Sequence, residues 1–139
     1  MGLPLRVYGS GPLESQLKNI AKKNINFVGK VTDEEMAKLY AGAKAFILAQ
    51  KDEDFGMTAV EAMSFGTPVI AYKGGGYLES VIEGKTGLFF GELNVENLSS
   101  TVTKFNKVRL NPEDCIRQAN KFSLERFKKE ILSFITEHA

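Results

Sequence analysis

The strongest constraint on the fold of this chain is a repeated alternation of strand-like and helix-like segments. Between stretches with apolar residues at helical spacing lie five short apolar runs: "LPLRVYG" (3–9), "INFVG" (25–29), "AKAFILA" (43–49), "PVIAY" (68–72) and "TGLFFG" (86–91). Strands that alternate with helices favour a parallel sheet with right-handed crossovers and helices on both faces. The sequence therefore predicts an α/β chain built on a doubly wound parallel sheet.

Local signals at helix ends add detail to this prediction. Thr32 followed by Glu35 is a capping-box pattern, and Gly66 stands where a left-handed helix end is expected. A short helix is expected over 77–83, closed by Gly84. The C-terminal third is predicted to be helical in two or three pieces, broken near Asn111 and at Ser123. The last piece is amphipathic. We expect its apolar face to pack on the same domain, with docking on another domain as the alternative.

Composition narrows the classes of function. A chain of 139 residues is predicted to form one domain, and its net charge of +1 gives no sign of a nucleic-acid partner. Cys115 is the only cysteine, so no internal disulfide can form and a reducing cytoplasm fits; we expect a structural role for it. The single histidine, His138, is expected to be a solvated tail residue, which argues against catalytic or metal sites built on histidine. No apolar run approaches the roughly 18 residues that a membrane helix needs.

The main candidate site is the stretch "EDFGMTAVEAMSFGTPVIA", which begins at Glu53. A helix that starts near Met57 would present free backbone N–H groups at Gly56, Met57 and Thr58. Such a helix end attracts phosphates and sugar hydroxyls. Glu53 precedes the helix and Glu61 lies just over one turn into it, and a carboxylate can accept the two hydroxyls of a ribose diol or of a hexose. The alternatives are a solvated loop acid for Glu53 and a helix-dipole partner for Glu61.

Two glycine-rich loops follow strands, "GSGP" (9–12) and "KGGG" (73–76). Ligands of doubly wound sheets bind outside the carboxyl ends of the strands, so each loop is either a ligand loop or a plain turn. "GSGP" does not match the dinucleotide fingerprint, because Glu14 stands where the third glycine of G-x-G-x-x-G belongs, and the sequence contains no P-loop pattern G-x-x-x-x-G-K-S/T. Asp52 and Asp54 overlap the candidate sugar motif, and no metal site is predicted there.

The stretch from Glu53 resembles the donor-binding domain of the retaining glycosyltransferases of family 4, which have the two-domain GT-B architecture. The family motif is E-G-F-G-x-x-x-x-E-A-M-A-x-G-x-P-V-I-A. The order of the other segments is also similar over nearly the whole chain, from "VYGSGP" through "NINFVGKV" and "DEEMAKLYAGAKAFILAQ" to "GGGYLESVIEGKTGLFF". Asp54 departs from the usual glycine, and this variant is similar to a mannosyltransferase-like subgroup.

The resemblance implies a role for each matching residue. Glu53 would act at the catalytic centre by holding donor-sugar hydroxyls near the reacting carbon, and Glu61 would bind the ribose hydroxyls. Backbone contacts to sugar and diphosphate are implied for Phe55, Gly56, Met57 and Thr58. Gly29, Lys30 and Val31 would form a loop at the nucleobase. Gly9 and Gly11 would border the nucleotide. No metal or other cofactor is implied, and the donor would be GDP-mannose in preference to UDP-glucose.

The resemblance also implies that residues 1–139 are a partial nucleotide-sugar donor-binding domain. The family's acceptor-binding N-terminal domain, which would bind a glycan or a lipid-linked acceptor, has no counterpart here, and neither has the first strand of the donor-binding domain. In a strand order of 3-2-1-4-5-6 that strand is central, so we expect an exposed gap in the sheet through which copies could self-associate. The chain alone is expected to be inactive.

Several alternatives for the function stay open at this point. The chain could be a UDP-sugar-dependent glucosyltransferase domain, a nucleotide-sugar-binding subunit of a split transferase that needs a partner chain, or a nucleotide sensor without chemistry. The expected location is cytoplasmic, with the full-length enzyme peripheral at a membrane.

Overall fold

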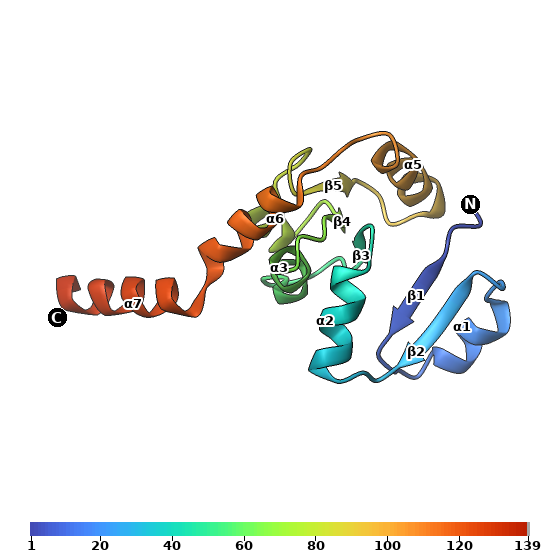
Figure 1. Cartoon of the computed structure of the whole chain (residues 1–139), viewed down its shortest axis with the longest axis horizontal. Helices are drawn as coiled ribbons and strands as arrows, with labels where there is room; N and C mark the ends of the chain where they lie inside the picture. Colours follow the sequence, from blue (N-terminus) through green and yellow to red (C-terminus); the bar gives the residue numbers. More distant parts are fainter. Residues whose placement is uncertain (139) are drawn as a thin grey trace. The chain divides into compact units, whose positions relative to one another are not determined.

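The computed structural model describes residues 1–138, and the chain forms two compact units (Figure 1). The first unit is Met1–Leu39, and the second takes in the rest of the described chain from Tyr40. The boundary falls inside a helix, α2 (Asp33–Ala41).

The first unit is built on a two-stranded parallel sheet. Its elements are β1 (Leu5–Tyr8), α1 (Glu14–Ile20), β2 (Ile25–Gly29) and most of α2. The register of the strand pair shifts between Val7 and Tyr8, so that Tyr8 lies opposite Gly29. No residue of this unit is fully buried, and apolar side chains of α1 such as Leu17 remain exposed.

The predicted capping box at the start of α2 is confirmed. The backbone N–H of Thr32 donates to Glu35 Oε2 at 2.8 Å, and the backbone N–H of Glu35 donates to Thr32 Oγ1 at 3.3 Å. The Thr32 hydroxyl also donates to Glu35 Oε2, at 3.1 Å. Because hydrogen bonds to the ionised carboxylate stabilise it, the Thr32 backbone N–H, followed by this hydroxyl, lowers the pKa of Glu35.

The second unit contains a three-stranded parallel sheet of order β3-β4-β5. Its strands and the helices between them are β3 (Phe46–Leu48), α3 (Met57–Ser64), β4 (Val69–Tyr72), α4 (Tyr77–Ser80) and β5 (Gly87–Phe90). The helices that follow are α5 (Val95–Phe105), α6 (Pro112–Ala119), the 3₁₀ turn η1 (Asn120–Phe122) and α7 (Leu124–His138).

The core of the second unit lies on both faces of this sheet. On one face Ile70 and Phe90 pack against Val102 of α5. Val69 and Ala71 point to the opposite face, because side chains alternate along a strand, and both are fully buried. α3 contacts β3 and β4 and packs against α6.

The predicted α/β class and the five predicted strands are therefore confirmed within residues 1–138. The strand orders β1-β2 and β3-β4-β5 are those that the order 3-2-1-4-5-6 leaves when its first strand is absent. β1 and β3 each pair with a strand on one side only among the described residues.

The predicted helix ends are confirmed at three places in the second unit. Gly66 has a φ of +78°, Asn111 accepts a hydrogen bond from the Glu113 N–H at 3.1 Å, and Ser123 Oγ accepts one from the Arg126 N–H at 3.3 Å. The helix expected over 77–83 is shorter than predicted and ends at Ser80, where the backbone becomes extended. Just beyond this helix, the Ile82 N–H donates a hydrogen bond to the Thr86 hydroxyl at 2.8 Å.

The expectation that the C-terminal helix α7 packs on its own domain is wrong for the described residues. None of its residues is buried, and Figure 1 shows it extending beyond α6, away from the three-stranded sheet. Its apolar side chains are exposed, Phe127 at 63% and Phe134 at 58%. The predicted amphipathic helix is therefore confirmed, but its apolar face is not covered by the described part of this unit.

The only cysteine and the only histidine of the sequence lie as predicted. Cys115 is fully buried in α6, and burial, followed by the charge of Asp114, raises the pKa of its thiol to about 11. His138 is exposed at the end of α7, with its ring stacked on Phe134. No helix within residues 1–138 has the length and apolar character to cross a membrane.

Candidate functional site

The loop between β3 and α3 lies at the carboxyl end of the second unit's sheet. It ends at Gly56, whose φ of +79° is left-handed, and α3 begins at Met57. A side chain at this position would be strained by the backbone and would also meet the ring of Tyr77 at 2.7 Å. Glycine therefore gives both the sharp turn into the helix and the close packing against Tyr77.

Glu53 is fixed by this turn rather than solvated. Its side chain is half-buried, and its Oε1 accepts a hydrogen bond from the Gly56 N–H at 3.1 Å. Its Oε2 lies 3.5 Å from the hydroxyl oxygen of Tyr77. The interpretation of Glu53 as a solvated loop acid is therefore wrong.

The start of α3 retains free donors, although not all those predicted. The Gly56 N–H is occupied by Glu53, so the expectation that it is free is wrong. The N–H groups of Met57 and Thr58 have no acceptor among residues 1–138. Met57 is exposed and Thr58 half-exposed, so this helix end presents two donors and its partial positive charge to solvent.

Glu61 lies one turn further along α3 and is exposed. The hydroxyl of Tyr40 donates to its Oε2 at 3.2 Å. Tyr40 is buried between an edge-on ring of Phe46 and a stacked ring of Phe65, at centroid distances of 5.3 and 5.9 Å. A cluster of packed aromatic rings therefore supports one oxygen of this carboxylate.

The "KGGG" turn after β4 supports the Glu53 loop. The Gly76 N–H donates to the Glu53 backbone carbonyl at 2.8 Å. An added Cβ would lie 2.2 Å from the Glu53 carbonyl oxygen at Gly75, and 2.3 Å from Phe55 Cα at Gly76. The glycines of this turn are thus needed for the contact between two backbones. On the same loop, the ring of Phe55 packs edge-on against Phe122, with centroids 5.5 Å apart.

Two residues of this site were missed by the sequence analysis, Gln50 and Tyr77. Tyr77 is fully buried, and its hydroxyl donates to Gln50 Oε1 at 3.0 Å. Burial, followed by the charge of Glu53 and the hydrogen bond to it, raises the pKa of Tyr77 to about 12. The only sequence signal for Tyr77 is a polar-tipped aromatic residue directly after three glycines.

The remaining predicted residues lie in the first unit, at the carboxyl ends of β1 and β2. The Gly9 N–H donates to the Gly29 carbonyl at 2.8 Å, so the two loops are joined there. Side chains added at Gly9, Gly11 or Gly29 would meet no atom within 4 Å. Lys30 is exposed and Val31 half-exposed. This edge of the first unit is open and accessible.

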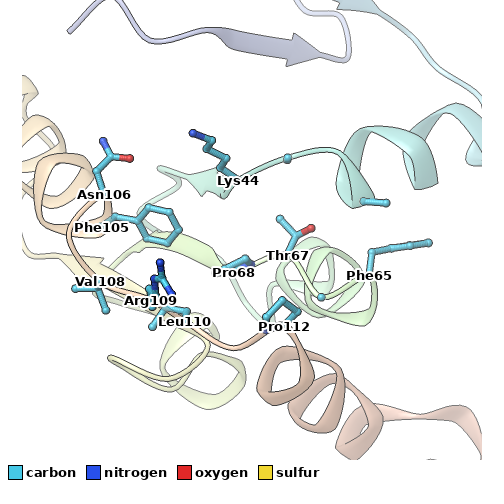
Figure 2. A pocket seen from close by; sticks show the side chains of 13 residues that line it. Lys44, Phe65, Thr67, Pro68, Phe105, Asn106, Val108, Arg109, Leu110 and Pro112 are labelled. Atoms are coloured by element: carbon cyan, nitrogen blue, oxygen red, sulfur yellow. The ribbon is translucent and has the colours of Figure 1, made fainter.

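A hollow of about 500 Å³ lies elsewhere in the second unit, and Figure 2 shows the side chains around it. Lys44 and Pro68 precede β3 and β4, so the hollow is at the amino ends of these strands; Phe105 and Arg109 line another side. None of the predicted site residues lines it. Since ligands of doubly wound sheets bind at the carboxyl ends, the Glu53 region is the stronger candidate. No group of three His, Cys, Asp or Glu residues in the described chain could hold a metal ion.

Comparison with known proteins gives a family for this chain. The family model described as "Glycosyl transferases group 1" matches residues 2–122. Mannosylfructose-phosphate synthase of Agrobacterium fabrum is 34% identical over 93 residues, which cover 66% of this chain and 20% of that protein. The chain thus spans only about a fifth of this relative.

Solved structures agree on the fold. Sucrose-phosphate synthase of Thermosynechococcus elongatus matches 96% of this chain and 38% of its own, with a TM-score of 0.81 at 24% identity. HepE of Anabaena, solved in complex with UDP, matches 97% of this chain and 41% of its own, with a TM-score of 0.79 at 20% identity. At such identities the likeness concerns the fold, which is the Rossmann-like half of a GT-B glycosyltransferase. The extent of the family match shows that this chain belongs to the glycosyl transferases group 1 family.

Proposed function

We propose that this chain is the donor-binding part of a retaining hexosyltransferase that transfers mannose from GDP-mannose to a glycan or glycolipid. The observation that supports this most is the start of α3. Two free backbone N–H groups, at Met57 and Thr58, stand there between two supported carboxylates, Glu53 and Glu61. This arrangement offers donors and partial positive charge to a diphosphate, and acceptors to the hydroxyls on either side of it.

The roles that we propose within the second unit follow from these groups. The helix end would stabilise the charge that develops on the leaving diphosphate, as backbone donors do in other sites for developing anions. Glu53 would hold hydroxyls of the donor sugar near the reacting carbon, and Glu61 would bind the ribose diol. Phe55 and Gly56 would supply the backbone next to the sugar.

For the first unit we propose contacts to the nucleoside. Gly9 and Gly11 would border the nucleotide, since their loop has open space where side chains would otherwise stand. The backbone of Gly29, Lys30 and Val31 would meet the base. The acceptor would be bound by another part of a longer protein, so the chain by itself is not expected to transfer sugar.

Mannose is supported by two observations. Asp54 gives the acid-Asp-Phe-Gly form of the motif, and the Agrobacterium relative is named as a mannosylfructose-phosphate synthase. A UDP-sugar such as UDP-glucose is the second candidate, because the Anabaena neighbour was solved with UDP. The nucleotide-sugar-binding subunit of a split transferase is also supported, by the uncovered apolar face of α7. Self-association through the open sides of β1 or β3 stays a prediction.

Calorimetric titration with GDP, GDP-mannose, UDP and UDP-glucose tests this proposal. We expect guanine-selective binding, and a loss of about tenfold or more in Glu61→Ala, because a hydrogen bond to a charged group contributes about 1.5–3 kcal/mol. The matched control is Glu96→Ala, at an exposed acid in the first turn of α5, which should leave binding unchanged. A preference for UDP would replace the mannose assignment by a UDP-sugar, and binding to none of the four ligands would contradict the donor site.

A further inference from the structure

The buried tyrosine behind the Glu53 loop is not explained by packing alone. Tyr77 is the first residue of α4, its ring is fully buried, and the ring fills the space in front of Gly56. A phenylalanine would fill the same space. The hydroxyl would be unfavourable here without polar partners, because a buried hydroxyl must replace its bonds to water.

Two polar side chains meet this hydroxyl, and both belong to the loop that precedes α3. Gln50 Oε1 lies at 3.0 Å and Glu53 Oε2 at 3.5 Å from the Tyr77 oxygen. A phenol has one proton to donate, and the shorter distance gives it to Gln50 in this structure. Glu53 Oε2, at the limit of hydrogen-bond distance, is the second acceptor within reach of the same proton.

Glu53 is thereby approached from two sides. Its Oε1 accepts from the Gly56 N–H at 3.1 Å, and its Oε2 faces the Tyr77 hydroxyl. An ionised carboxylate has about four acceptor positions, so these contacts leave positions for ligand hydroxyls. The raised pKa of Tyr77, about 12, keeps the hydroxyl protonated at neutral pH and excludes it as a base there. Its chemistry is that of a fixed donor.

We propose that Tyr77 is a positioning residue, which holds Glu53 and Gln50 in the orientation in which they receive the sugar of a nucleotide-sugar. Gln50 is then a further sugar-binding residue: its Oε1 is turned to Tyr77, and its exposed amide N–H groups, which have no acceptor among residues 1–138, are available to sugar hydroxyls. This proposal rests on the proposed function of the same site. It assigns Tyr77 to the sugar and not to the diphosphate, whose predicted donors are at Met57 and Thr58.

The substitution Tyr77→Phe separates these two parts of the ligand. The gain in affinity from GDP to GDP-mannose, and from UDP to UDP-glucose, should fall by about fivefold, which corresponds to one hydrogen bond. Affinity for the nucleoside diphosphates should stay within about twofold. The control is Tyr72→Phe, since Tyr72 is half-buried at the end of β4 and its hydroxyl has no partner in the described chain. In a Glu53→Ala background the tyrosine change should have a smaller effect, because only its effect through Gln50 remains.

A second readout needs no ligand. If Tyr77 holds Glu53, the Gly56 amide, which donates to Glu53, should exchange its proton about fivefold faster in Tyr77→Phe than in Tyr72→Phe. Unchanged exchange at Gly56 would overturn the positioning role by itself. Equal losses for diphosphate and nucleotide-sugar would also overturn it, because they indicate a general structural defect. A parent chain that binds no nucleotide would contradict the proposed function, while the exchange measurement would still decide whether Tyr77 positions Glu53.

Discussion

Gly76→Ala is expected to destabilise the second unit by about 3 kcal/mol or more and to abolish nucleotide-sugar binding. Its added Cβ would lie 2.3 Å from Phe55 Cα and 2.5 Å from the Asp54 carbonyl oxygen. These are backbone atoms, which cannot move aside as a flexible side chain can, so the cost reaches the upper end of the range for overpacking. The Gly76 N–H bond to the Glu53 carbonyl would be lost with the contact. Urea unfolding measures the first effect and calorimetric titration the second.

The matched control for this change is Gly91→Ala. Gly91 follows β5, has no left-handed φ, and would place its Cβ in open space. We expect a change in unfolding free energy within about 0.5 kcal/mol. If the two variants are equally stable, the "KGGG" turn does not support the Glu53 loop by close backbone contact.

Gly56→Ala is expected to have the next largest effect, about 2–4 kcal/mol. A left-handed backbone costs a non-glycine residue roughly 1–2 kcal/mol, and the clash of the Cβ with the Tyr77 ring at 2.7 Å adds an overpacking term. Relief of the clash would move the Gly56 N–H away from Glu53. Affinity for a nucleotide-sugar should therefore fall together with stability, as measured by titration at a temperature where the variant is folded.

Gly84→Ala separates the two causes of this effect. Gly84 has a similar φ of +72°, but an added Cβ there meets no atom within 4 Å. Only the backbone term, roughly 1–2 kcal/mol, should appear, and ligand binding should be unchanged. Equal losses of stability in the two variants would show that packing against Tyr77 does not explain why glycine is needed at position 56.

Local patterns were sufficient to predict the strands and most helix ends. Buried parallel strands are near-continuous apolar runs, and "PVIAY" contains β4 for this reason. Caps such as Thr32 and Asn111 act within three residues of their partners, so their geometry follows from short sequence patterns. α4 is shorter than predicted because the chain after Ser80 is held by another contact, in which the Ile82 N–H donates to the Thr86 hydroxyl. Thr86 lies six residues after the observed helix end, outside the local helical pattern.

The geometry of the candidate site could be predicted only where it depends on residues that are neighbours in the chain. Glu53, Met57 and Thr58 are close in sequence to the helix start that organises them, and the motif gave their positions. The contact of Tyr77 with Gln50 joins residues 27 apart, and nothing in the local pattern of either residue requires it. The occupied Gly56 N–H was missed because the motif places Glu53 before the helix but does not give the direction of its side chain.

Binding of a nucleoside diphosphate at the start of α3 is tested by amide chemical-shift mapping with GDP and with UDP. We expect the largest shifts at the N–H groups of Met57 and Thr58, whose donors are free in this structure. Shifts should be small around the hollow at the other end of the sheet, at Lys44 and Arg109. The opposite pattern, with large shifts at Lys44 and Arg109 and none at Met57 and Thr58, would contradict nucleotide binding at this helix end.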